Sequence, residues 1–256
     1  MIIETTRNEA VKRARQLSQR KGRQEQGVHF IEGEKLVREA IISGAEFENA
    51  FIEEGHELME AVLAGSGANV YTVKRHVMES MTNTTTPQWV CATVKTPSTQ
   101  PPAVYPSGML IALDRVQEPG NLGTIIRSAD AMGARGVLIG DGSADAFAPK
   151  PVRASMGSIY HVQIWNVDLR RELYRLRDEG YSLICGHLGG SEVLPETGAN
   201  CVLVVGNESQ GVSDDIAGMC ELYRLPMYGF AESLNASVAA SLMMYDIAKR
   251  MRAGER

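Results

Sequence analysis

The sequence predicts an α/β protein with two parts, a small N-terminal α/β domain and a larger C-terminal domain whose mostly parallel sheet has helices on both faces. Its 256 residues, 44% of them apolar, suffice to bury two cores. Beyond residue 108, short apolar runs alternate with segments of helical spacing, as is typical of parallel strands. A stretch with four prolines, TPSTQPPAVYPSG, precedes this alternation. We therefore place the domains at 1–96 and 108–256, with a linker at 97–107.

The N-terminal domain is predicted from three signals. It opens with an amphipathic basic helix, which a short strand at His29–Glu32 follows. Apolar residues then recur at helical spacing, at Leu36, Val37, Ala40 and Ile41.

The C-terminal domain begins with a predicted βαβ unit, made of strand Met109–Leu113, helix Leu122–Met132 and strand Val137–Ile139. The elements expected after it are strands at Ser182–Cys185, Cys201–Val205 and Tyr223–Leu225, and helices at Leu169–Asp178 and Asn235–Met251.

The last of these helices carries an apolar band wider than one sheet-facing stripe. Its members are Val238, Ala239, Leu242, Met243, Tyr245, Ile247 and Ala248. The band fits a helix wedged into the core or the seam of a homodimer, and the pattern leaves both open.

The net charge argues against a wholly basic coat for nucleic acid, because it is −5. Any RNA contact must be local. Within the first 25 residues, the basic side chains Arg7, Lys12, Arg13, Arg15, Arg20, Lys21 and Arg23 face only Glu4, Glu9 and Glu25. This basic segment is either an RNA contact or a solvated face.

Other classes of protein are disfavoured too. No apolar run approaches the roughly 18 residues of a membrane span, and we expect no contact with a membrane. The cysteines Cys91, Cys185, Cys201 and Cys220 lack CxxC spacing, which favours reduced thiols in a cytoplasmic protein. The histidines are isolated, so we expect no metal site.

The first candidate loop is 114–123, DRVQEPGNLG, which leads into the helix with Arg127. Pro119 and Gly120 favour a turn, and Asn121 can cap the new helix. Open α/β sheets bind ligands at the carboxyl ends of their strands, so Arg127 lies near a predicted binding edge. A solvated helix charge is the alternative.

Two later loops are also candidates. In 202–214, VLVVGNESQGVSD, glycines allow close approach of a ligand and Glu208 offers a carboxylate, although an ordinary loop has similar composition. In 223–240, YRLPMYGFAESLNASVAA, Ser233 and Asn235 can cap a helix whose N-terminus suits an anion, although capping alone explains them.

Common catalytic signatures are missing from the sequence. It contains no G-x-G-x-x-G after the first strand, no P-loop and no G-x-S-x-G elbow. Dehydrogenases, kinases, ordinary Rossmann methyltransferases and serine hydrolases are therefore disfavoured, and the residues alone indicate an α/β ligand-binding protein.

In order and position, the three loops resemble the three motifs of the SpoU/TrmH family of RNA ribose 2′-O-methyltransferases. Residues 121–127 (NLGTIIR), 206–211 (GNESQG) and 225–239 (LPMYGFAESLNASVA) are similar to the first, second and third motif. With RASMG at 153–157, the resemblance covers 107–256; Ser209, Gln210 and Ala236 depart from it. The stretch 23–40 more loosely resembles a small substrate-binding domain that many family members carry.

This resemblance implies a deep trefoil knot in the C-terminal domain, an exception to the usual rule against knots. It also implies S-adenosylmethionine as methyl donor and a homodimer. The cofactor-binding residues that it implies are Val205, Gly206, Asn207, Leu225, Met227 and Leu234.

By the same resemblance, Arg127 removes the ribose 2′-hydroxyl proton. The polar residues that assist it are Asn121, Glu208, Ser233 and Asn235. Because the pKa of arginine lies above about 12, Arg127 can equally hold a phosphate and stabilise the developing alkoxide.

Capture of RNA is expected from Lys12, Arg13, Arg23, Arg153 and Ser155. The extra domain favours ribosomal RNA, 23S rRNA in particular, and transfer RNA is the alternative. A noncatalytic RNA-binding module of the same fold and a methyltransferase of small molecules or proteins are further alternatives.

Overall fold

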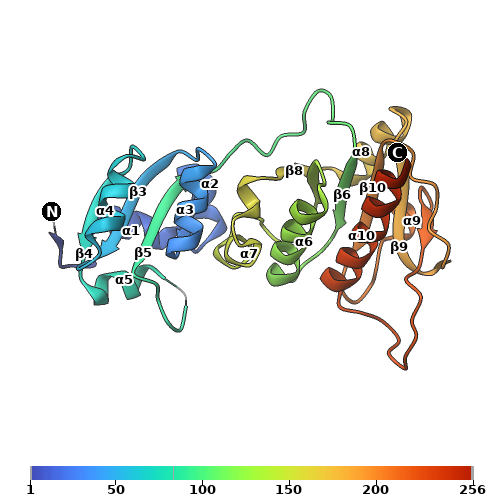
Figure 1. The fold of residues 1–256 in the computed structure, drawn as a ribbon. Helices are drawn as coiled ribbons and strands as arrows, with labels where there is room; N and C mark the ends of the chain where they lie inside the picture. Colours follow the sequence, from blue (N-terminus) through green and yellow to red (C-terminus); the bar gives the residue numbers. More distant parts are fainter. Residues whose placement is uncertain (1, 83, 255–256) are drawn as a thin grey trace. The chain divides into compact units, whose positions relative to one another are not determined.

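The computed structural model describes residues 2–82 and 84–254, and the chain divides into two compact units (Figure 1). The first unit comprises Met1–Pro97 and Phe147–Tyr160, and the second comprises Ser98–Ala146 and His161–Arg256. In this grouping residues 147–160 belong to the first unit, and residues 98–107 of the predicted linker belong to the second.

The first unit contains a mixed five-stranded sheet in the order β1-β4-β3-β5-β2. The strands are β1 (Ile2–Ile3), β2 (Val28–Glu32), β3 (Phe47–Glu53), β4 (Asn69–Val73) and β5 (Val90–Lys95). The helices are α1 (Glu9–Gln16), α2 (Arg20–Gln26), α3 (Glu34–Ile42), α4 (Glu57–Ala64), α5 (Arg75–Met81) and α7 (Pro149–Ser155), with a 3₁₀ turn, η1 (Ser158–Tyr160). Strand β4 runs parallel to β1 and β3, whereas β5 runs antiparallel to β2 and β3.

The predicted basic helix is two helices. Asn8 caps α1 by accepting from the amide of Ala10, and Gly27 ends α2 in the left-handed region, with φ of 65°. The predicted strand at His29–Glu32 and the helix after it are confirmed by β2 and α3, and α3 buries Leu36, Val37 and Ala40.

The second unit contains a six-stranded sheet in the order β11-β9-β10-β6-β7-β8, with every pair parallel. The strands are β6 (Met109–Asp114), β7 (Gly136–Gly140), β8 (Gln163–Val167), β9 (Ser182–Ser191), β10 (Cys201–Gly206) and β11 (Glu221–Tyr223). The helices are α6 (Pro119–Met132), α8 (Leu169–Asp178), α9 (Asp214–Ala217) and α10 (Ala236–Gly254).

Side chains on both faces of this sheet are buried. Leu110 and Val202 pack with Leu173 of α8 in one apolar cluster. The alternate strand residues, such as Ile111 and Leu203, are fully buried as well. Helices α6 and α10 lie side by side and pack on β7 and β10 (Figure 1). The predicted mostly parallel sheet with covering helices is confirmed.

Two strands were predicted with the wrong boundaries. Strand β9 continues to Ser191, and β11 covers Glu221–Tyr223 and ends before Leu225. Tertiary contact explains both differences, because a Cβ at Gly190 would lie 2.7 Å from the backbone of Leu222. The glycine-rich end of β9 thus lets β11 approach, a pairing that apolar periodicity does not reveal.

All four cysteines are free, and Cys91, Cys185 and Cys201 are buried. Among the described residues, no helix is both long enough and apolar enough to cross a membrane.

Candidate cofactor and catalytic site

The predicted site lies where the strand order of the second sheet reverses. Strand β6 pairs with β7 on one side and with β10 on the other, so that Asp114 stands opposite Gly206 at the carboxyl ends. The chain continues from β6 to β7 and β8, whereas β9 and β11 lie beyond β10. Such a switch point is where open α/β sheets bind ligands. The loops after β6 and β10 therefore meet at a favoured binding edge.

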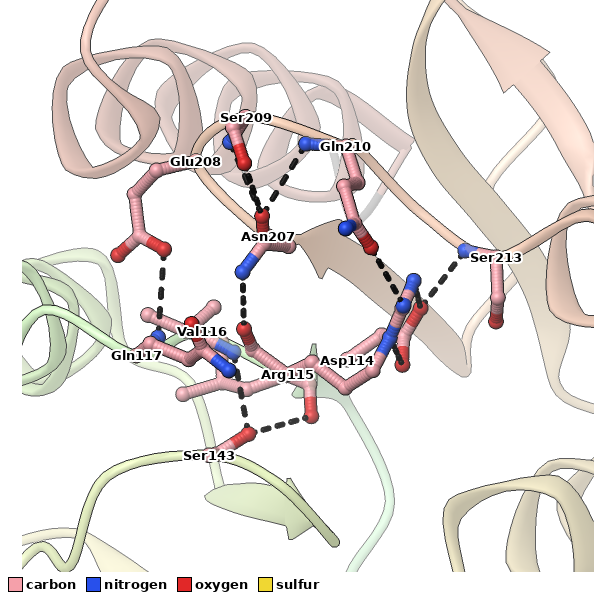
Figure 2. A network of polar contacts seen from close by, with 11 residues as sticks. Asp114, Arg115, Val116, Gln117, Ser143, Asn207, Glu208, Ser209, Gln210 and Ser213 are labelled. Atoms are coloured by element: carbon pink, nitrogen blue, oxygen red, sulfur yellow. Dashed lines mark hydrogen bonds and ion pairs between the residues drawn. The ribbon is translucent and has the colours of Figure 1, made fainter.

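Asn207 holds the loop after β10 in shape (Figure 2). Its Oδ1 accepts from N and Oγ of Ser209, at 3.0 and 2.9 Å, and from N of Gln210 at 3.1 Å. Its Nδ2 donates to the carbonyl oxygen of Arg115 at 2.9 Å. The backbones of Asn207 and Gly211 also pair. This side chain closes one loop and fastens it to the other.

Asp114 makes a second link between the two loops (Figure 2). Its carboxylate accepts from the amide of Ser213 at 2.7 Å and pairs with the Arg115 guanidinium at 3.1 Å. Arg115 has φ of 58° and also donates to Oε1 of Gln210 at 2.9 Å. Burial alone would raise the pKa of Asp114, but the hydrogen bonds from Arg115 and Ser213 outweigh it and lower that pKa below 3.8.

A chain of side-chain hydrogen bonds joins Glu208, Asn121 and Asn235. Asn121 Nδ2 donates to Glu208 Oε1, and Asn235 Nδ2 donates to Asn121 Oδ1; each of these hydrogen bonds is 3.0 Å long. Asn121 is only 7% exposed, so water competes little for these bonds. The structure thus brings together three of the five predicted catalytic residues, one from each motif.

The carboxylate of Glu208 receives two further hydrogen bonds, from the amides of Glu118 at 3.0 Å and Gln117 at 3.2 Å. Burial acts to raise the pKa of Glu208, but the Asn121 side chain and the backbone amides outweigh it and lower that pKa from 4.5. A carboxylate stabilised in its charged form is a weak base, so Glu208 is suited to orient Asn121 rather than to remove a proton.

Helix capping was predicted correctly at one end of this chain and wrongly at the other. Asn235 caps α10, because its Oδ1 accepts from the amides of Ser237 at 2.9 Å and Val238 at 3.4 Å. The cap of α6 is Glu118, whose Oε2 accepts from the amide of Asn121 at 2.6 Å. Asn121 lies inside α6, and its side chain is therefore available to the site.

The other two predicted catalytic residues stand apart from the chain of hydrogen bonds. Arg127 lies on α6 and is exposed, and no hydrogen bond or ion pair joins its side chain to another of the described residues. Ser233 is exposed in the segment before α10 and lines the cavity described next. Both side chains are thus accessible to a substrate.

A cavity of about 790 Å³ opens beside the loop after β10. It is lined by all six predicted cofactor-binding residues, which are Val205, Gly206, Asn207, Leu225, Met227 and Leu234. Glu208 and Ser233 also line it. Its size and its mixture of apolar and polar walls suit an organic cofactor.

The lining fits S-adenosylmethionine. A Cβ at Gly206 would lie 2.2 Å from the backbone of Gly211 and Val212, so only glycine allows the two backbone segments to approach this closely at the cavity wall. Leu225 and Leu234 supply apolar surface for a nucleobase, and the Glu208 carboxylate suits a positively charged sulfonium.

Some site residues escaped sequence reasoning. Asp114, Arg115 and Gln117 lie in the first candidate loop, but their types alone did not distinguish them from turn residues. His187 and Leu188 line the cavity from the end of β9, a segment without any motif. Only the pairing of β9 with β10 brings them to this edge.

The predicted RNA-binding residues all lie in the first unit. Lys12 and Arg13 are exposed and pair with Glu9 at 2.7 Å and Glu48 at 2.9 Å. Arg153 is exposed on α7, and no described residue forms an ion pair or a hydrogen bond with its side chain.

The other two predicted RNA-binding residues are buried. Arg23 donates to the carbonyl oxygens of Leu17 and Ser18, and Ser155 donates to that of Val152. Side chains enclosed in this way are poorly placed for phosphate contact, because their donors serve the fold.

Residues 2–82 and 84–254 contain no cluster of side chains that could ligate a metal ion. Nowhere among them do three His, Cys, Asp or Glu side chains gather as a metal site requires. The expectation that no metal is used stays a prediction.

The chain is similar in sequence to known proteins. Residues 108–245 match the SpoU rRNA Methylase family, and residues 8–92 match the MRM3-like substrate binding domain. The chain is 32% identical over 249 residues to the 23S rRNA (guanosine(2553)-2′-O)-methyltransferase RlmP of Bacillus subtilis (strain 168), covering 96% of this chain and 98% of that protein.

Solved structures resemble this chain over nearly its full length. An AdoMet-bound rRNA methyltransferase from Sinorhizobium meliloti superposes with a TM-score of 0.88 at 32% identity, covering 98% of this chain and 97% of that one. The SpoU methyltransferase AviRb from Streptomyces viridochromogenes, in complex with AdoMet, gives 0.86 at 25% identity, covering 96% and 99%.

Proposed function

The chain belongs to the SpoU rRNA methylase family, and from this premise we propose that Asn121, Arg127 and Glu208 serve the transfer of a methyl group to a ribose 2′-hydroxyl. The protein is an S-adenosylmethionine-dependent RNA (ribose-2′-O)-methyltransferase that acts on ribosomal RNA. The observation that carries the assignment of residues is the hydrogen-bonded chain Glu208–Asn121–Asn235 beside the 790 Å³ cavity.

Val205, Gly206 and Leu225 would hold the cofactor, together with the other predicted lining residues. When bound there, S-adenosylmethionine supplies an electrophilic methyl group. The protein's contribution is to bring the ribose hydroxyl in line with that methyl group, and such positioning lowers a barrier by several kcal/mol, up to about 11 for a well-oriented pair.

Arg127 is proposed to bind a phosphate of the RNA and to stabilise the alkoxide that develops at the 2′-oxygen. Two features support this role. The side chain is exposed and without an ion pair among the described residues, so its guanidinium is available to an incoming anion. A guanidinium also rarely gives up its proton, which favours electrostatic stabilisation over proton removal.

Asn121 and Asn235 are proposed to orient the site, and Ser233 to contact the substrate near the hydroxyl. Glu208 fixes the Asn121 amide through an ionised carboxylate, and Asn235 fixes it from the other side. Because both bonds end on one buried amide, the three motifs keep one geometry as the substrate arrives.

A trefoil knot and a homodimer belong to the proposal as well. The knot is implied by family resemblance, with the second and third motifs threading past each other. For the dimer, apolar side chains of α10 are exposed in the single chain; Val238, Leu242 and Tyr245 are each about half exposed. Such a row suits burial against a second copy.

The proposed substrate is 23S rRNA. The match of residues 8–92 to a substrate-binding domain and the similarity to RlmP support this choice. Domains at 1–96 and 108–256 with a linker at 97–107, and RNA contact through Lys12, Arg13 and Arg153, are part of the same proposal, as is action in the cytoplasm.

Transfer of labelled methyl from S-adenosylmethionine to unmodified 23S rRNA transcript, followed by ribose-specific mapping, tests this function. We expect label at a single 2′-O position. Binding of the cofactor without any transfer to ribosomal or transfer RNA would instead support a noncatalytic module of the same fold.

A further inference from the structure

We propose that a second cavity, in the first unit, binds one unpaired nucleotide of the RNA, with the base against Trp89 and the phosphate at Lys35 and Arg153. This cavity has a volume of about 650 Å³. It lies among the start of α3, the start of β5 and the end of α7. The proposal rests on the proposed function only in taking RNA as the substrate.

An aromatic stack borders this cavity. The rings of His56 and Trp89 lie 3.9 Å apart between centroids with 8° between their planes, so they are parallel and in contact. Trp89 is half-buried and lines the cavity. Because His56 fixes the indole, the ring is preorganised to extend the stack by one more flat group. Stacking on aromatic side chains is the usual way in which proteins hold single-stranded bases.

The charges at the cavity are positive once internal pairs are taken into account. Glu32 accepts from Thr84 Oγ1 at 2.7 Å and from the amide of Gln88 at 3.0 Å. Glu34 pairs with Arg38 at 2.8 Å. Glu34 is therefore compensated by Arg38, whereas Glu32 is held by neutral donors and keeps its charge. With Lys35 and Arg153 included, the net charge of the lining is +1.

Two cations remain at the cavity without such compensation. The side chains of Lys35 and Arg153 are exposed, and none of the described residues forms an ion pair or a hydrogen bond with either side chain. Since they come from α3 and α7, they can approach one ligand from two sides. An ammonium and a guanidinium beside an aromatic ring match the phosphate and base of a nucleotide.

The shape of the cavity favours an unpaired nucleotide over a duplex. Its volume falls in the range of about 300 to 1,000 Å³ that small-ligand sites have. A base in a helix is stacked and paired, whereas a base in a loop or bulge can turn outward into such a cavity. The site would thus select RNA with an exposed base.

Tryptophan fluorescence of the full chain tests this directly. The sequence has two tryptophans, and the other one, Trp165, is only 5% exposed in the core of the second unit. In a Trp165→Phe variant, emission therefore reports on Trp89. The probes are a single-stranded ten-nucleotide RNA, a blunt RNA duplex of the same composition, and inorganic phosphate. We expect quenching by the single strand alone.

Affinity for a fluorescein-labelled version of the same single strand, measured by anisotropy with the natural tryptophans present, provides the second test. Trp89→Ala should weaken binding by roughly tenfold or more, and Trp89→Phe should restore most of it. Lys35→Ala and Arg153→Ala should each weaken binding several-fold and lower the slope of log affinity against log salt by about one. Lys95→Ala, an exposed lysine of the same unit outside the cavity, is the matched control.

Unchanged affinity in Trp89→Ala, or equal quenching by duplex or by phosphate, would overturn the proposal. Methyl transfer to 23S rRNA is measured in parallel. Transfer by the natural protein together with unchanged binding in all cavity variants removes this proposal and leaves the enzymatic function intact. Quenching by the single strand without methyl transfer to any RNA would support this nucleotide site and contradict the enzymatic function.

Discussion

The side-chain amide of Asn235, which caps α10, donates a 3.0 Å hydrogen bond to Oδ1 of Asn121, 114 residues earlier in the chain. Asn121 in turn donates to Glu208. One buried amide therefore connects the start of α6, the loop after β10 and the start of α10. A change at Asn121 should disturb all three segments, which makes this residue the most informative one to vary.

Asn121→Asp is predicted to impair methyl transfer in a manner that depends on pH. The new carboxylate would replace a donor 3.0 Å from the ionised Glu208, and two such charges repel each other. Transfer should fall by about tenfold or more near pH 8 and recover partly near pH 6, where the pair can share a proton. Asn121→Ala, which removes the bonds without adding charge, should lack that recovery, and parallel pH profiles for the two variants would contradict the account.

Asp114→Asn is predicted to lower stability at neutral pH and to lose this effect in acid. The folded-state pKa of Asp114 is below its ordinary value of 3.8, so its ionised form stabilises the fold above that value. The contribution is lost as pH falls through the lowered pKa. Denaturant unfolding should therefore show a difference between the natural protein and the variant that is constant above about pH 5 and shrinks below about pH 4. A constant difference down to pH 2 would show that Asp114 acts in some other way.

Gly206→Ala is predicted to damage both the fold and the cofactor cavity. The added Cβ would meet the backbone of Gly211 and Val212 at 2.2 Å, and backbone atoms cannot move aside cheaply. We expect a loss of about 2 kcal/mol or more in unfolding free energy, a size typical of overpacking, and much weaker binding of S-adenosylmethionine in calorimetry. Gly229→Ala in the third motif is the control, because a Cβ there meets nothing within 4 Å; equal effects of the two changes would refute the steric argument.

Leu242→Glu is predicted to produce monomers. Leu242 is 46% exposed on α10, between Val238 and Tyr245, and a charge there would make burial against a second copy unfavourable. Sedimentation velocity should show a dimer for the natural chain and a monomer for the variant. Leu58→Glu changes an even more exposed leucine of the first unit and should leave the mass unchanged. A monomeric natural chain would remove the dimer from the proposal.

Several elements could be predicted from the sequence because local signals coincide there. Helix α8 was expected at Leu169–Asp178 and occupies those residues; Asp168 caps it by accepting from the amide of Arg171, and Leu173 and Leu176 are buried at helical spacing. The fully apolar strands β6 and β10 were found for a similar reason, since burial on both faces leaves an uninterrupted apolar run.

What could not be predicted depends on contacts between distant segments. The role of Asn121 as a bridge requires Glu208 and Asn235 to arrive from elsewhere in the chain, and its local context indicated a cap instead. The burial of Arg23 could not be predicted for the same reason, because its guanidinium donates to carbonyl groups in the turn between α1 and α2. A basic residue in a basic segment gives no sign of such a role.

The most direct test of the central claim is single-turnover methyl transfer to 23S rRNA by Arg127→Ala, measured beside the affinity of the same variant for S-adenosylmethionine. Arg127 is exposed and is not among the residues lining the 790 Å³ cavity, so the account predicts unchanged cofactor affinity. The rate should fall by roughly 100- to 1,000-fold, as for the loss of one group that stabilises a developing charge. A normal rate, or a loss of cofactor affinity as large as the loss of rate, would contradict the account.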